Sequence, residues 1–112
     1  MEAGRSELIS GTLDLLILKT LSMGALHGYG IAQQIHRLSS DSLRVEEGSL
    51  YPALQRMQAK GLVSSDWKRS PTGRQARYYR LTAAGRRQLG LDEASFLDSV
   101  AAIKRVLRGS ES

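Results

Sequence analysis

Residues 49–82 read SLYPALQRMQAKGLVSSDWKRSPTGRQARYYRLT, and this stretch decides the fold. Its first part carries an apolar stripe at helical spacing: Leu50, Leu54 and Met57. Pro52 has no backbone N–H to donate, so it fits the first turn of a helix, and Gly61 is typical of the position just after a helix. We therefore predict a helix over about residues 48–60.

In the second part of the stretch the sequence pattern changes to a period of two residues, which is typical of a half-buried strand. Two such runs, residues 63–68 and 77–81, flank the turn sequence SPTG at residues 70–73. We predict a β-hairpin over about residues 63–82. Three side chains are expected to pack beneath it, with stacking on bases as the alternative: Trp67, Tyr79 and Leu81. Tyr78 lies on the other face and is the better candidate for an exposed contact.

Both ends of the chain are expected to be helical. Residues 7–23 are dense enough in leucine and isoleucine to predict a helix that is buried on most sides. After a glycine-rich break, a second helix is predicted over about residues 29–38, and residues 43–45 are expected to form a short extended piece. Thr82 is a typical N-cap for a final helix that runs to about Arg108.

Three helices, a hairpin and a final helix follow one another in the order of a winged helix-turn-helix. The predicted fold class is mainly α with a small β-hairpin (α+β), in which a winged helix-turn-helix is followed by a C-terminal dimerisation helix. We divide the chain into a winged helix-turn-helix DNA-binding domain at residues 1–82 and a dimerisation helix with a frayed tail at residues 83–112.

The positive charge of the chain is concentrated in its middle. The 112 residues include 16 basic and 11 acidic ones, a net charge of +5. Residues 44–87 alone carry ten basic and three acidic residues, a net charge of +7, and residues 67–87 contain no acidic one. Such a local positive field attracts polyanions, with a merely solvated basic face as the alternative.

The predicted helix and hairpin both offer groups suited to DNA. Helix residues turned away from the apolar stripe are small or able to form hydrogen bonds, as contact with base edges requires: Ser49, Gln55, Arg56 and Ala59. On the hairpin, a slim tip ending in Arg74 is backed by further cations suited to phosphate or to the minor groove: Lys68, Arg69 and Arg77. Both elements indicate double-stranded DNA as the partner. The alternative is a small α+β domain whose basic hairpin only keeps it soluble.

The final helix carries a heptad-like apolar stripe of its own: Leu89, Phe96, Val100, Ile103 and Leu107. A terminal helix with such a stripe has to bury it, so we predict a homodimer, with packing into a monomer core as the alternative. Gly85 and Gly90 weaken the first half of this helix by about 1 kcal/mol each relative to alanine.

Several other classes of function lack the residues that they need. The absence of cysteine excludes disulfides, a thiolate zinc site and a cysteine nucleophile. No nucleophile–base pair, phosphate-binding glycine loop or carboxylate cluster is present, so we expect no enzyme activity. His27 and His36 have no cluster of ligands nearby, so we expect neither a metal nor a cofactor. Because we find no signal peptide or membrane span, we expect a soluble cytoplasmic protein, associated with the nucleoid when it is bound to DNA.

Short motifs also follow one another along most of the chain: GTLDLLIL (11–18), HGYGI (27–31), EGSLYPAL (47–54), GLV (61–63), GR (73–74), RYYRLT (77–82) and Gly85. Each motif is weak alone, but their order and spacing are specific. With these motifs the chain resembles the PadR-like transcriptional regulators, a family of small winged-helix DNA-binding proteins.

The resemblance implies a homodimer, usually a repressor, that binds a palindromic operator with one winged domain per half-site. It also implies that the third helix is the recognition helix, that the hairpin is the wing and that the C-terminal helix makes the dimer. The recognition residues would be Ser49, Tyr51, Gln55 and Arg56, and the wing contacts Arg74 and Arg77, with Tyr78 or Tyr79 near the DNA backbone. Gln55 and Arg56 lie just beyond the matched motif and rest on the helical-face argument. For Tyr51, a core position and a phosphate contact are equally open.

Some short-tailed members of this family take flat aromatic or drug-like effectors between the helices of the dimer. Phe96 is the single aromatic residue of the C-terminal helix and the one candidate for such a site, with a plain core phenylalanine as the alternative. We thus expect a sequence-specific transcriptional repressor that a small aromatic effector releases. A winged-helix protein–protein interaction adaptor without specific DNA binding is the alternative function, although an adaptor has no need of a positive wing tip.

Overall fold

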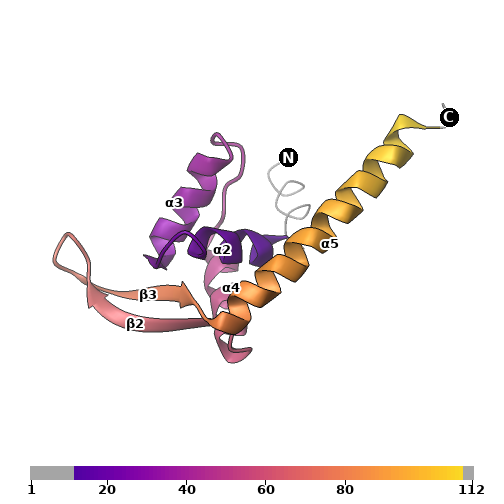
Figure 1. Cartoon of the computed structure of the whole chain (residues 1–112). Helices are drawn as coiled ribbons and strands as arrows, with labels where there is room; N and C mark the ends of the chain where they lie inside the picture. Colours follow the sequence, from indigo (N-terminus) through magenta and orange to yellow (C-terminus); the bar gives the residue numbers. More distant parts are fainter. Residues whose placement is uncertain (1–11, 110–112) are drawn as a thin grey trace.

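The computed structural model describes residues 12–109, and Figure 1 shows the arrangement of its elements. Three helices pack together, a long hairpin extends from them on one side, and the last helix runs away on the other. The elements follow in the order α2 (Leu13–Leu21), β1 (Leu26–His27), α3 (Gly28–Leu38), α4 (Glu47–Ala59), β2 (Val63–Arg69), β3 (Gln75–Leu81) and α5 (Ala83–Arg108). This α+β architecture confirms the predicted fold class.

One hydrophobic core joins α2, α3, α4, the base of the hairpin and the first turns of α5. Its largest fully buried side chains come from the three packed helices: Ile17, Leu18, Leu21, Ile31, Leu50, Leu54 and Met57. Tyr79 and Leu81 are buried as well, as predicted for the side chains beneath the hairpin. The apolar stripe of residues 48–60 is therefore the face that α4 turns inward.

The sheet contains a strand that the sequence did not reveal. Its order is β1-β3-β2 with antiparallel pairing throughout, and β1 sets Leu26 opposite Tyr79 and His27 opposite Tyr78. Two residues are too few to show an alternating pattern, so β1 has no periodic signal.

Residues 43–45, expected to form a short extended piece, are not part of any strand of the sheet. The Ser39 hydroxyl accepts a hydrogen bond from the Leu43 N–H (2.9 Å), which ties this loop back to the end of α3. Of the helix predicted over residues 7–23, the described part contains α2; residues 7–11 lie outside the described residues. No helix in residues 12–109 is both long and apolar enough to span a membrane.

A compact junction joins the end of α4, the base of the hairpin and the start of α5. Gly61 follows α4 with φ = 76°, a left-handed conformation that favours glycine. Thr82 is the N-cap of α5, as predicted: its hydroxyl accepts a hydrogen bond from the Gly85 N–H (3.0 Å) and donates one to the Gly61 carbonyl (2.7 Å). A Cβ on Gly85 would overlap the backbone carbonyl of Leu62, so the two chain segments touch there without a side chain between them.

We expect opposite effects from alanine at the two glycines of α5. Gly85→Ala should lower the free energy of unfolding by about 1–3 kcal/mol, because the backbone around Leu62 has to move. Gly90→Ala should raise it by about 0.5–1 kcal/mol, because a Cβ there meets no atom within 4 Å and alanine favours the helix. Thermal unfolding of both variants checks this, and a Gly85→Ala protein as stable as the Gly90→Ala protein would contradict it.

Candidate nucleic-acid interface

Helix α4 presents a polar face to solvent. Four side chains point into the core, each no more than 1% exposed: Leu50, Ala53, Leu54 and Met57. The predicted recognition residues consequently lie on the exposed part of the helix: Ser49, Tyr51, Gln55 and Arg56. Their exposure agrees with the helical-face argument.

Gln55 and Arg56 differ in what they already bind. Arg56 donates from Nη2 to Oδ1 of Asp14 on α2 (3.0 Å), so its guanidinium leans toward α2 and is half exposed. Gln55 forms no side-chain hydrogen bond within residues 12–109, so its amide is free to bind an external group. Arg56 would first have to leave Asp14.

Tyr51 lies between the core and the surface, being 41% exposed. Its phenol rests on Gly28 at the start of α3, where any Cβ would collide with the hydroxyl. Partial burial raises the pKa of the Tyr51 phenol, and the negative charge of Glu47 raises it further. The phenol therefore keeps its proton at neutral pH and can donate a hydrogen bond to an anion.

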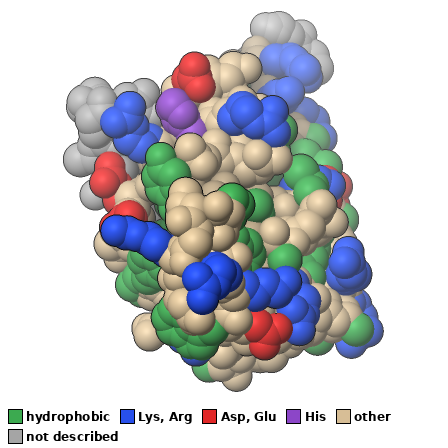
Figure 2. Space-filling view, turned by 90° about the vertical axis from the view of Figure 1, so that its left-hand side faces the viewer, with side chains coloured by type: hydrophobic (Ala, Val, Ile, Leu, Met, Phe, Trp, Pro, Cys, Tyr) green, Lys and Arg blue, Asp and Glu red, His purple; other side chains and the backbone are tan. Residues whose placement is uncertain are grey.

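The wing, which is the β2–β3 hairpin, ends in a tight and strongly basic tip. The Ser70 N–H donates to the Arg74 carbonyl (2.7 Å), and Gly73 takes φ = 91° between them. Arg69 donates from Nη1 to the Gly73 carbonyl (3.1 Å), which braces the turn. The predicted wing cations are all exposed: Lys68, Arg69, Arg74 and Arg77. Figure 2 views the molecule from the hairpin side and shows Lys and Arg side chains among hydrophobic groups on this face.

Two aromatic residues of the wing, Trp67 and Tyr78, differ from the prediction in their exposure to solvent. Trp67 is 61% exposed, so the prediction that it packs beneath the hairpin is wrong. In the strand register it lies opposite Arg77, beyond the edge of the core. Tyr78, predicted to be exposed, is half-buried on the opposite face, where the His27 ring packs against its edge (5.2 Å between centroids).

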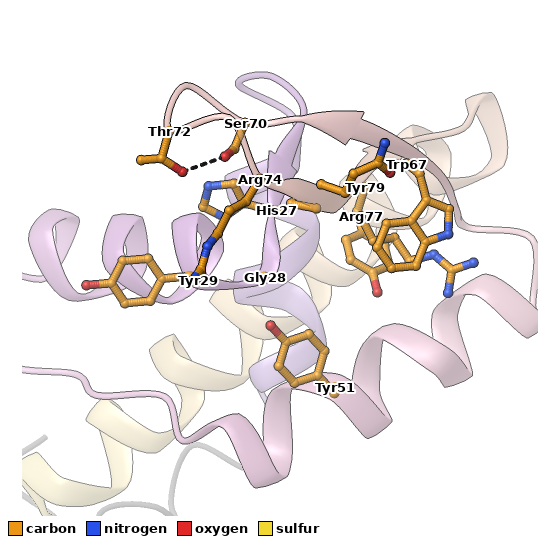
Figure 3. A pocket seen from close by; sticks show the side chains of 12 residues that line it. His27, Gly28, Tyr29, Tyr51, Trp67, Ser70, Thr72, Arg74, Arg77 and Tyr79 are labelled. Atoms are coloured by element: carbon orange, nitrogen blue, oxygen red, sulfur yellow. Dashed lines mark hydrogen bonds between the residues drawn. The ribbon is translucent and has the colours of Figure 1, made fainter.

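A groove of about 550 Å³ separates the wing from the starts of α3 and α4. Figure 3 shows Tyr51 reaching from α4 into the space that Trp67, Arg74 and Arg77 approach from the hairpin. The groove combines aromatic surfaces with cations, which suits a sugar–phosphate chain.

Two residues of this groove carry no simple sequence signal for their role. His27 is the N-cap of α3, and its Nδ1 accepts a hydrogen bond from the Gly30 N–H (2.9 Å). Gly28 admits the Tyr51 ring. Both belong to the HGYGI motif, so their positions are visible in the sequence, but the contact between α3 and α4 is not. Within residues 12–109, no three His, Cys, Asp or Glu side chains gather as a metal site would require.

The predicted dimerisation residues divide into two groups along α5. Leu89 is only 8% exposed and belongs to the core of its own chain, so it is not available to a partner, contrary to the prediction. Farther along, Phe96, Ile103 and Leu107 are 38%, 56% and 78% exposed, and Val100 is half-buried. The reason for the division is that α5 extends beyond the packed helices (Figure 1).

Solved structures with similar architecture include two regulators. The PadR-like transcriptional regulator BC4206 of Bacillus cereus superposes with a TM-score of 0.79 at 30% identity, over 94% of this chain and 100% of that one. A PadR family transcriptional regulator of Eggerthella lenta has a TM-score of 0.80 at 28% identity, over 97% of this chain and 93% of that one.

Sequence comparison also finds a transcriptional regulator among the relatives of this chain. Transcriptional regulator Rv3488 of Mycobacterium tuberculosis is 41% identical over 78 residues, which are 70% of this chain and 69% of that protein. The family model described as "Transcriptional regulator PadR-like family" matches residues 17–91, a range that includes α4 and the whole wing. With that match over more than half of its length, the chain belongs to the PadR-like family of transcriptional regulators.

Proposed function

We propose that this regulator binds double-stranded DNA sequence-specifically as a homodimer, with α4 in the major groove and the wing on the adjacent backbone. The observation that carries the proposal is a set of wing cations beside the exposed face of α4. None of the four forms an ion pair within residues 12–109: Lys68, Arg69, Arg74 and Arg77. Arg56 and Arg80, in contrast, are paired with Asp14 and Asp66. Positive charge that no carboxylate of the same chain compensates is available to phosphates.

We assign the contacts by the geometry of each element. Ser49, Tyr51, Gln55 and Arg56 on α4 are the proposed recognition residues, and Gln55 is the best placed of them to read a base edge because its amide is free. The wing residues Lys68, Arg69, Arg74 and Arg77 bind the backbone. Tyr78, assigned to the backbone from the sequence, faces away from the groove and is left out of the proposed contacts.

The homodimer is proposed from the continuity of one helix face. Leu89 and Leu107 lie on the same side of α5 at about 100° per residue, and Phe96, Val100 and Ile103 lie between them on that side. The face is covered by the core at Leu89 and exposed at Leu107. A second copy, related by a twofold axis, would cover the exposed part and give two α4 helices spaced for a palindrome. Residues 1–82 and 83–112 are then the DNA-binding and dimerisation parts.

Repression and its release are the remaining parts of the proposal. A dimer seated on an operator blocks the transcription machinery, and a small aromatic effector would loosen it from the DNA. Phe96 is the proposed effector contact, because it is the single aromatic residue of α5 and is partly exposed next to the proposed dimer face. The cytoplasm, where DNA is accessible, is the proposed location.

Binding to a duplex should depend strongly on salt. If two wings and two α4 helices neutralise about six to ten phosphates, the affinity should fall by ~10³–10⁵ between 50 and 200 mM salt. Fluorescence anisotropy with a labelled duplex at several salt concentrations measures this. A response that is flat with salt would instead favour the protein–protein adaptor.

The wing and α4 should contribute to binding in different ways. Arg74→Ala should weaken binding to all sequences alike, because a phosphate contact carries no base information. Gln55→Ala should cost about 1–3 kcal/mol on an operator selected from a random pool and little on arbitrary DNA. Arg80→Ala is the matched control, since Asp66 already pairs with that arginine (2.9 Å) and its loss should change the affinity little. The assignment fails if Arg74→Ala alters sequence preference and Gln55→Ala does not.

A charge on the exposed face of α5 should separate the dimer without unfolding the chain. Ile103→Asp places a carboxylate where the second copy would bury it, which disfavours the dimer by several kcal/mol. Ala94→Asp adds the same charge on the opposite side of α5 and should leave the dimer intact. Sedimentation of the wild type and both variants at tens of micromolar decides the matter. A wild type that is a monomer and still binds its operator tightly would refute the dimer.

A further inference from the structure

Trp67 has an unusual environment for a tryptophan. It is the only one in the chain, and 61% of its surface is exposed on β2 instead of buried. Its cross-strand partner is Arg77, whose guanidinium carbon lies 5.2 Å from the centroid of the indole. This distance is within the range of a cation–π contact. The exposed indole is therefore a surface on which the Arg77 guanidinium rests.

Arg77 also differs from the other arginine near the end of β3. Arg80 lies on the opposite face and donates from Nη1 to Oδ2 of Asp66 (2.9 Å), so its charge is compensated. Arg77 has no carboxylate partner within residues 12–109. Stacking occupies the flat face of a guanidinium and leaves the N–H groups at its edge unused. Contact with the indole thus leaves the hydrogen-bond donors of Arg77 available.

Both side chains line the groove between the wing and the starts of α3 and α4 (Figure 3). Tyr51, whose phenol remains protonated, lines the same groove from α4. A DNA backbone passing between α4 and the wing would bring a phosphate to this place. We propose that Trp67 is a positioning residue for DNA binding, whose indole holds the Arg77 guanidinium over the groove with its donors toward a backbone phosphate. This inference rests on the proposed function.

The opposite face of the wing provides a matched comparison. There the Lys68 ammonium lies 5.6 Å from the centroid of the Tyr78 ring, which is a second cation–π pair in the same hairpin. Tyr78 does not line the groove, and its other neighbour is the His27 ring. If cation–π pairs acted only by stabilising the hairpin, replacing either aromatic ring would affect DNA binding equally.

A double-mutant cycle on the full chain tests the proposal. The affinity for a short labelled duplex of arbitrary sequence is measured at low salt for the wild type, Trp67→Leu, Arg77→Gln and the double variant. Trp67→Phe and Tyr78→Leu serve as the rescue and the control. Circular dichroism melts of all variants show whether the hairpin remains folded.

We expect Arg77→Gln to weaken binding about tenfold and Trp67→Leu about threefold to tenfold. In the Arg77→Gln background, Trp67→Leu should cause no further loss beyond about twofold, because its effect acts through the guanidinium. Trp67→Phe should restore most of the affinity, since a phenyl face also supports a guanidinium. Tyr78→Leu should change the affinity less than about twofold, because the Lys68 ammonium binds phosphate as a point charge and, unlike a guanidinium, needs no ring to orient its donors.

Three results would overturn the inference. Unchanged binding by Trp67→Leu shows that the indole has no role, and an equal loss in both backgrounds shows that it acts independently of Arg77. Equal losses for Trp67→Leu and Tyr78→Leu show a role in hairpin stability alone. In all three cases the wild type still binds DNA, so the proposed function survives. A wild type that binds no duplex refutes the proposed function and this inference together.

Discussion

The geometry of the whole interface depends on the junction between the end of α4 and the start of α5. The Thr82 hydroxyl links the Gly61 carbonyl to the Gly85 N–H, and Gly85 packs directly on the backbone of Leu62. These contacts fix the base of the wing against the end of α4 and fix the direction in which α5 leaves. The proposed function needs two DNA-contacting elements and a dimer helix in a fixed arrangement, and a close-packed junction deforms little.

The two faces of the wing differ in whether their arginine is paired with a carboxylate. On one face, Asp66 compensates Arg80, and Tyr78 packs with His27. On the groove face, Arg77 rests on an aromatic ring and has no acidic neighbour in the described part of the chain. The uncompensated positive charge of Arg77 is therefore on the groove face of the hairpin, which the net charge of the hairpin does not reveal. An uncompensated cation beside a protonated phenol is a better phosphate site than the same cation in an ion pair, because no internal partner has to be displaced.

One apolar face runs along helix α5, and its two ends lie in different environments. Near Leu89 the face is part of the core, and by Leu107 it is exposed. A helix is too stiff to fold the exposed end back onto its own domain, so that end needs a partner or stays in water. Two tasks are consequently separated along α5. Leu89 contributes to the stability of the domain, and the apolar residues after it are available for the proposed dimer.

The sequence by itself determined the order of the elements other than β1 and most of their bounds. Helix α4, the hairpin and the N-cap at Thr82 all follow from local signals, namely period, turn residues and capping chemistry, which act over a few positions. The family was also visible in short motifs. The polar face of α4 could be predicted because a helix that buries one stripe necessarily exposes the opposite side.

Only the tertiary structure decided which of these side chains meet. Alternation places Trp67 on the same face as Tyr79, but it does not say where the core ends along that face. The sequence pattern therefore cannot tell that Tyr79 is buried and Trp67 is exposed. The pairing of Arg56 with Asp14 joins residues 42 positions apart and has no local pattern. The same holds for Leu89, which repeats the stripe of α5 but lies over the core. Periodicity reports the direction of a side chain, whereas its contacts depend on how far the neighbouring elements extend.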